Sequence, residues 1–190
     1  LEEDKRLGQE NEMILKLPYS KEEFALPPNL HLIGTMNTSD KSIAPIDIAL
    51  RRRFKFVEMM PKEDILPTID GIDLYKMLKK LNDRIEYLYD RDHKIGHAYF
   101  VNLSTLNEII ETFKNKIIPL LQEYFYEDFY KVGLILGGIG TSKDDKYIVY
   151  KKEGNPEDLF DGVIDGDFPI VEKYYIKYEI GFQEILNIYA

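Results

Sequence analysis

The side chains best suited to chemistry lie in two short runs. The apolar run His31–Met36 leads into Asn37, which is followed by Thr38 and Asp40, and further on stands the triplet Arg51-Arg52-Arg53. In phosphoryl transfer an asparagine can orient the attacking water, and an arginine can neutralise the charge that develops on the transferred phosphate. Guanidinium suits this role because it stays charged and matches phosphate oxygens with a rigid fork of donors. Together the two runs favour a nucleotide site.

Each run also has an ordinary structural explanation. A single asparagine at the end of a strand is more often a turn former. Three consecutive arginines are usually solvated charge or a nonspecific anion patch. Taken separately, neither run decides a function, but their order and spacing together are much more specific.

The flanking segments predict part of a parallel α/β sheet. His31–Met36 has the pattern of a short buried strand, and Phe54–Met59 that of a second strand. Between them Ser42 or Asp40 is expected to cap a short helix over Pro45–Leu50. Ligand sites in open parallel sheets form where strands end, which is where Asn37 falls.

The middle of the chain has helical periodicity. Apolar residues from Leu74 to Leu88 recur at helical spacing and predict an amphipathic helix. Thr105 and Glu108 form a capping box that opens a second helix. Pro119 must kink that helix or begin a new one. We therefore expect a small helical bundle.

The last part of the chain is less regular. A further short helix is expected over Asp128–Leu136 and ends at Gly137-Gly138. Strands are expected over Lys146–Lys151 and within Pro169–Ile180, followed by a short helix near Ile185–Tyr189. The predicted domains are residues 1–62 (α/β core), 63–137 (helical lid) and 138–190 (an extension of unknown role).

Composition narrows the class of protein. Of the 190 residues 44% are apolar and 31% charged, as in globular proteins, and the absence of cysteine excludes disulfides and thiolate chemistry. The net charge of −9 argues against a large nonspecific surface for nucleic acid. No apolar run is long enough for a membrane span, and the polar N-terminus does not resemble a secretory signal. We expect a cytoplasmic protein.

Residues 29–61 resemble the nucleotide-binding subunit of McrB-type, modified-cytosine-dependent (5-methylcytosine-specific) restriction systems, a branch of the AAA+ ATPase superfamily. Ile33–Ala44 matches that family's signature after the Walker B strand, and Ile46–Phe56 matches its arginine-finger segment. Ser39 and Lys41 stand where alanine and arginine are commoner. The resemblance covers roughly residues 1 to 137 and extends into the lid through Leu81–Ile85, Asp92–Phe100 and Ile117–Phe125.

The resemblance implies roles for individual residues. Asn37 takes the place of sensor 1, which reads the γ-phosphate and holds the attacking water. Arg52 and Arg53 take the place of arginine fingers that reach the neighbouring subunit's nucleotide, with Arg51 as a third candidate. Further residues are implied in nucleotide binding or the subunit interface, namely Asp40, Thr38, Asp47, His97 and Tyr99.

The resemblance also implies partners and cofactors. It implies a ring, expected to be a hexamer, that couples hydrolysis of GTP or ATP with Mg²⁺ to DNA translocation, beside an McrC-type nuclease subunit. DNA would be contacted mainly by regions outside these residues. No Gly-x-x-x-x-Gly-Lys-Ser/Thr motif occurs here, and Gly137–Lys143 has its lysine and hydroxyls in the wrong order. We therefore expect the P-loop upstream, no nucleotide bound to these residues alone, and little activity from them in isolation.

Two alternative functions remain open. A remodelling ATPase of the MoxR kind would share the superfamily features, and an inert module for subunit contacts would need none of the chemistry. His93 and His97 have the spacing of zinc ligands on a helix, but Gly96 lies between them and no third ligand is evident. We expect these histidines to be structural and predict no metal site.

Overall fold

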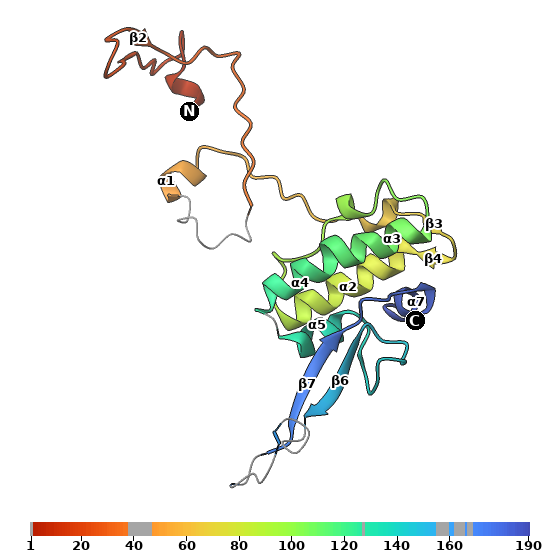
Figure 1. Cartoon of the computed structure of the whole chain (residues 1–190). Coiled ribbons are helices and arrows are strands. Elements are labelled where there is room, and N and C mark those ends of the chain that lie inside the picture. The colour runs from red at the N-terminus through yellow and green to blue at the C-terminus, as the bar shows by residue number, and fades with distance from the viewer. Residues whose placement is uncertain (1, 38–46, 127, 155–159, 162–165, 167–168) are drawn as a thin grey trace. The chain divides into compact units, whose positions relative to one another are not determined.

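A computed structural model describes residues 2–37, 47–126, 128–154, 160–161, 166 and 169–190 (Figure 1). It divides into two compact units, Leu1–Met59 and Met60–Ala190. Among the helices of these described ranges, none is long and apolar enough to cross a membrane.

The first unit has little regular structure. It contains a 3₁₀ turn η1 (Glu3–Lys5), the antiparallel pair β1 (Leu15–Lys16) and β2 (Glu23–Phe24), and the short helix α1 (Ile48–Arg51). The strands predicted over His31–Met36 and Phe54–Met59 are absent, and the side chain of Ile33 is 94% exposed. A strand needs a neighbour to satisfy its backbone polar groups, and the described part of this unit supplies none. Those two predictions were wrong for this chain.

The second unit is organised by α2 (Leu74–Leu88), as the periodicity predicted. Asp73 caps the helix by accepting a hydrogen bond from the backbone N–H of Lys76 at 3.0 Å. One face of α2 is fully buried and contributes Leu74, Met77, Leu78, Leu81 and Ile85 to the core. The turn η2 (Glu63–Ile65) and the short pair β3 (Thr68–Ile69) and β4 (Ile72–Asp73) precede it, and the turn η3 (His97–Tyr99) follows.

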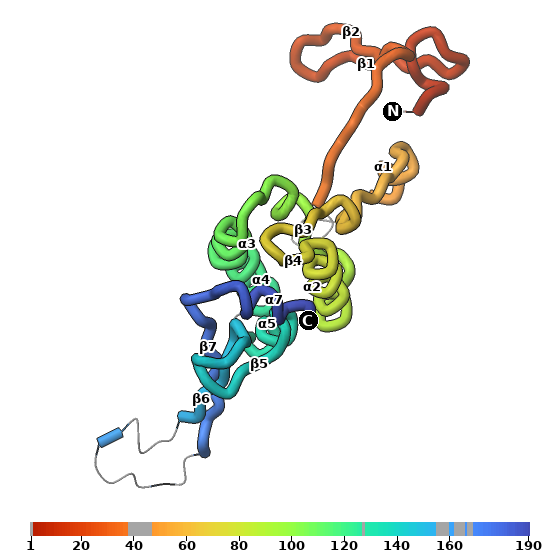
Figure 2. The backbone as a smooth tube through the Cα atoms, turned by 90° about the vertical axis from the view of Figure 1, so that its right-hand side faces the viewer, coloured from red at the N-terminus to blue at the C-terminus, as the bar shows by residue number. Residues whose placement is uncertain are grey.

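The helices that pack beside α2 also follow the predicted pattern. The capping box of Thr105 and Glu108 opens α3 (Leu106–Thr112). A π-helical turn η4 (Phe113–Ile117) then leads into α4 (Ile118–Tyr124), which carries Pro119 in its first turn. The backbone stays helical from α3 through the π turn into α4, so the π turn accommodates Pro119 and absorbs the change in hydrogen bonding without a break in the helix. Figure 2 shows α3 and α4 (green) beside α2 (yellow).

The chain then forms α5 (Phe129–Ile135), capped by Asp128, and turns at Gly137. Gly137 has φ +111°, and a Cβ built there would lie 2.7 Å from the carbonyl oxygen of Asn187. Only glycine fits this turn, because both the backbone angle and the close approach exclude a side chain.

A three-stranded sheet and a last helix complete the second unit. Its strands are β5 (Ile139–Gly140), β6 (Val149–Gly154) and β7 (Val171–Ile176), in the order β5-β6-β7. β6 runs parallel to β5 and antiparallel to β7. Helix α7 (Phe182–Asn187) packs back against the helices of this unit, so that Ile148, Val149, Ile180, Ile185 and Ile188 lie in the same core cluster as α2.

Candidate functional site

The arginine run lies at the end of α1, in the first unit. Asp47 begins the helix, because its carboxylate accepts a hydrogen bond from the backbone N–H of Ala49 at 2.9 Å. Asp40 and Ser42, the predicted caps, lie outside the described residues, and the observed cap is Asp47. The helix is only four residues long, so it presents Arg51, Arg52 and Arg53 within one turn.

The three arginines have different surroundings. The guanidinium of Arg51 lies 5.3 Å from the ring centre of Phe56, within the range of a cation–π contact. Arg53 donates through Nε to Glu2 at 3.1 Å and through Nη1 to the carbonyl of Ala49 at 3.0 Å. Among the described residues, no hydrogen bond, ion pair or ring contact engages the side chain of Arg52.

Asn37 belongs to the same unit. It is exposed and lies outside any helix or strand. Thr38 and Asp40, predicted beside it, lie outside the described residues. The described residues therefore fix the local setting of each arginine but not a complete nucleotide site.

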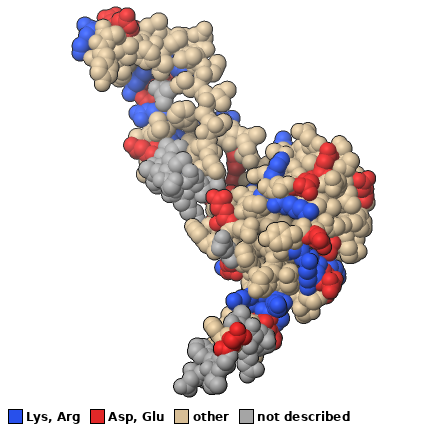
Figure 3. All heavy atoms as spheres, in the orientation of Figure 1, with Lys and Arg blue, Asp and Glu red and all other residues tan. Residues whose placement is uncertain are grey.

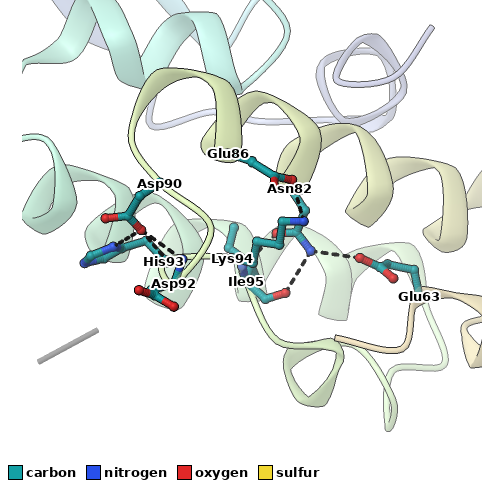
Figure 4. A network of polar contacts seen from close by, with 8 residues as sticks. All are labelled: Glu63, Asn82, Glu86, Asp90, Asp92, His93, Lys94 and Ile95. Atoms are coloured by element: carbon teal, nitrogen blue, oxygen red, sulfur yellow. Dashed lines mark hydrogen bonds and ion pairs between the residues drawn. The ribbon is translucent and has the colours of Figure 1, made fainter. Parts of the chain in front are cut away.

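A polar network in the second unit holds the loop between α2 and η3 (Figure 4). Asn82 is buried on the apolar face of α2, and its side chain accepts from the N–H of Ile95 at 2.7 Å and donates to the Ile95 carbonyl at 3.1 Å. The same amide donates to Glu63 at 3.1 Å. Because all three bonds join segments distant in sequence, Asn82 fixes the path of the loop that leads to η3.

The two histidines have separate structural partners. His93 is buried, and its Nδ1 lies 2.6 Å from the carboxylate of Asp90. Its ring packs edge-on against Tyr89 and Tyr124, at centroid distances of 4.3 and 4.8 Å. Burial raises the pKa of the Tyr124 hydroxyl above its ordinary value.

His97 instead accepts a hydrogen bond at Nδ1 from the backbone N–H of Lys62, at 3.1 Å. In its neutral form the ring then carries its proton on Nε2. Tyr99, on the same turn η3, is half-buried against the core. Within the described ranges, no group of three or more acidic or histidine side chains is arranged to hold a metal ion.

Sequence reasoning overlooked two positioning residues, Asn82 and Arg84. Asn82 was detectable, because a carboxamide on an otherwise apolar helix face must find buried partners. Arg84 donates from Nη1 to two carbonyls, those of Ile135 at 2.8 Å and Ile188 at 2.6 Å. It thereby joins α2 to the ends of α5 and α7, and no local pattern signals contacts so distant in sequence.

The predicted site residues thus fall into two sets. Asn37, Asp47 and the arginines belong to the first unit, whereas His97 and Tyr99 belong to the second. The structure places the three arginines on one turn of the first unit, and it places His97 and Tyr99 on one turn of the second.

Comparisons with known proteins address the family. Residues 73–133 match the family model described as McrB, alpha-helical lid domain. The chain is also 36% identical over 155 residues to the "Type IV methyl-directed restriction enzyme EcoKMcrB subunit" of Escherichia coli strain K12. That alignment covers 69% of this chain and 33% of the relative. The chain therefore spans about a third of the length of that relative.

Proposed function

Because this chain is of McrB type, we propose that it is part of a ring-forming NTPase subunit that drives DNA translocation in modification-dependent restriction. The similarity to a subunit of a methyl-directed restriction enzyme is the observation that carries this proposal. A ring, expected to be a hexamer, would bind GTP or ATP with Mg²⁺ and would act with an McrC-type nuclease subunit.

Within that ring, we assign the main trans-acting role to Arg52. An arginine finger must leave its own subunit and reach a neighbour's γ-phosphate, so a guanidinium already held by its own chain is a poorer candidate. Arg53 is bound to Glu2 and the Ala49 carbonyl, and Arg51 packs on Phe56. Arg52 has no such contact among the described residues, and Arg53 serves beside it.

Asn37 would act on its own subunit's nucleotide. As sensor 1 it orients the attacking water, so that nucleophile and transition-state charge are handled by residues of two different subunits. Asn82 fixes the loop before η3, which carries His97 and Tyr99. We propose that these two side chains contact the base or ribose of the nucleotide.

A mixing experiment tests the division between two subunits. We expect Arg52→Ala in the full-length subunit to lower nucleotide turnover about a thousand-fold. Asn37→Ala in the full-length subunit should also lower turnover strongly. Mixed rings place an intact Arg52 from one variant against an intact Asn37 from the other. We expect turnover of the mixture to exceed that of either variant alone.

Lys55→Ala is the matched control, since it removes a nearby exposed charge outside the arginine run, and its turnover should stay within about twofold of the unaltered subunit. Unchanged turnover in Arg52→Ala would refute the finger assignment. A mixture no more active than its components would show that both residues serve the same subunit.

A further inference from the structure

The strand β7 has one open edge. In the order β5-β6-β7 it lies at the side of the sheet, and among the described residues it pairs with β6 alone. An open edge presents unpaired backbone N–H and C=O groups, to which another extended chain can add.

The register identifies which residues point outward. The N–H of Lys177 donates to the carbonyl of Ile148 at 2.9 Å, and this pair continues the β6–β7 register. In an antiparallel ladder, hydrogen-bonded pairs alternate with pairs that are not bonded. Lys173 and Tyr175 therefore direct their backbone groups toward β6. Glu172, Tyr174 and Ile176 direct theirs toward the open edge.

A groove of about 360 Å³ follows this edge. It is lined from β7 by Lys173, Tyr174 and Tyr175, and from the start of α5 by Asp128, Phe129 and Tyr130. Successive side chains of a strand point to opposite faces. Three consecutive residues of β7 line this groove, as expected for a groove beside the edge of the strand. The Tyr130 and Tyr174 rings meet edge-on at 5.5 Å and form part of its wall.

The charges beside the groove are unbalanced on one face of the sheet. Lys152 and Lys173 lie directly opposite each other, both are exposed, and no carboxylate among the described residues pairs with either. Like charges in this position destabilise a strand pair. On the other face, Lys151 is neutralised by Glu172 at 2.6 Å. In Figure 3 basic side chains (blue) lie over the β6–β7 hairpin, with acidic ones (red) beside them.

We propose that the open edge of β7 binds an extended segment of a partner protein in which acidic and apolar residues alternate. The backbone of this segment pairs with Glu172, Tyr174 and Ile176. Its acidic side chains lie on the face of Lys152 and Lys173 and pair with Lys173, the nearer of the two, which relieves the repulsion between the lysines. Its apolar side chains point to the opposite face, toward Phe129 and Tyr130.

A second copy of this chain fits the edge less well. Antiparallel pairing of two β7 edges would bond the outward residues, so Lys173 would face Val171, Lys173 or Tyr175 of the other copy. None of these offers a carboxylate. Charge complementarity therefore favours an acidic partner segment over self-association.

Peptide titrations monitored by amide NMR test this proposal on the chain of residues 1–190. The probes are a peptide of alternating valine and aspartate, its valine–lysine counterpart, and the valine–aspartate peptide with its edge-facing amides N-methylated. We expect only the first to bind. It should slow hydrogen exchange at Glu172, Tyr174 and Ile176 and leave Lys173 and Tyr175, already bonded to β6, nearly unchanged.

Charge reversal supplies the second readout. Lys173→Glu should weaken binding of the aspartate peptide roughly tenfold and strengthen that of the lysine peptide, whereas Lys79→Glu, an exposed change on α2, should alter neither. Equal binding of both peptides, or protection outside the three outward amides, would overturn the proposal. So would a concentration-dependent dimer in which those amides are already protected without peptide.

Discussion

The two units differ in how they use their apolar residues. In the described part of residues 1–59 no side chain is buried, and Ile33, Val57 and Met59 are 94%, 69% and 84% exposed. In residues 60–190 one core gathers side chains from α2 through α7. Large exposed apolar side chains close together mark surfaces that pack against something else. The second unit is stabilised by its own core, whereas the described part of the first unit has no core.

The largest expected effect is the difference in unfolding free energy between two side-chain truncations, one in each unit. Leu81→Ala empties a fully buried position of α2 and should lower the free energy of unfolding by about 2–5 kcal/mol. Ile33→Ala removes an exposed side chain and should change it by no more than about 0.5 kcal/mol. Denaturant unfolding measures both. Similar losses of unfolding free energy in the two variants would show that Ile33 is packed. That result would contradict the proposed difference between the two units.

A second prediction concerns the polar group inside the core. Asn82→Leu leaves the N–H and C=O of Ile95 without their partner, so we expect a loss of about 2–4 kcal/mol. Asn102→Leu, at an exposed position of the same unit, is the control. Hydrogen exchange should rise selectively in residues 90–97. A loss of stability with that loop still protected would contradict the positioning role.

A third prediction tests how the lid holds the last helix. Arg84→Met keeps the apolar stem but removes the bonds to the carbonyls of Ile135 and Ile188, at a cost of about 1–3 kcal/mol. Hydrogen exchange should rise first in α7. Arg91→Met, an exposed change beyond the end of α2, should leave α7 protected. Equal exchange of α7 in both variants would show that Arg84 does not hold it.

The smallest effect is a pH dependence. Hydrogen bonds from the backbone N–H groups of Thr141 and Ser142, and from the Thr141 hydroxyl, hold the pKa of Asp145 below its ordinary value of 3.8. Because the folded pKa is the lower one, this stabilisation is complete above about pH 4 and is lost as pH falls through the folded pKa.

Asp145→Asn should therefore flatten the dependence of the unfolding free energy on pH below about pH 4. Asp144→Asn, at an exposed neighbour that makes none of these bonds, is the matched control. Equal slopes in the two variants over that range would exclude Asp145 as the source.

Patterns that are complete within a few turns of helix were predicted correctly from the sequence. The span of α2 and the capping box of Thr105 and Glu108 depend on neighbours three or four residues away. The strand over His31–Met36 was not formed, because pairing depends on segments that the apolar run does not specify.

The candidate site shows the same division. The arginine triplet could be located by its residue types, but the different contacts of the three arginines could not be predicted. Glu2, which holds Arg53, lies at the far end of the unit in sequence, and Phe56 contacts Arg51 only because α1 ends where it does. The catalytic roles of Asn37 and the arginines remain predictions.

The hydrogen bond between Asp73 and Tyr189 joins two segments that the ribosome makes at different times. The N–H at the start of α2 donates to a hydroxyl 116 residues later in the chain. Ribosomes add roughly 5–20 residues per second, so α2 emerges on the order of ten seconds before the segment that closes over it. During that interval its apolar face lacks the side chains of Ile185 and Ile188. Until α7 is made, the part of the α2 face that it covers is therefore exposed to solvent.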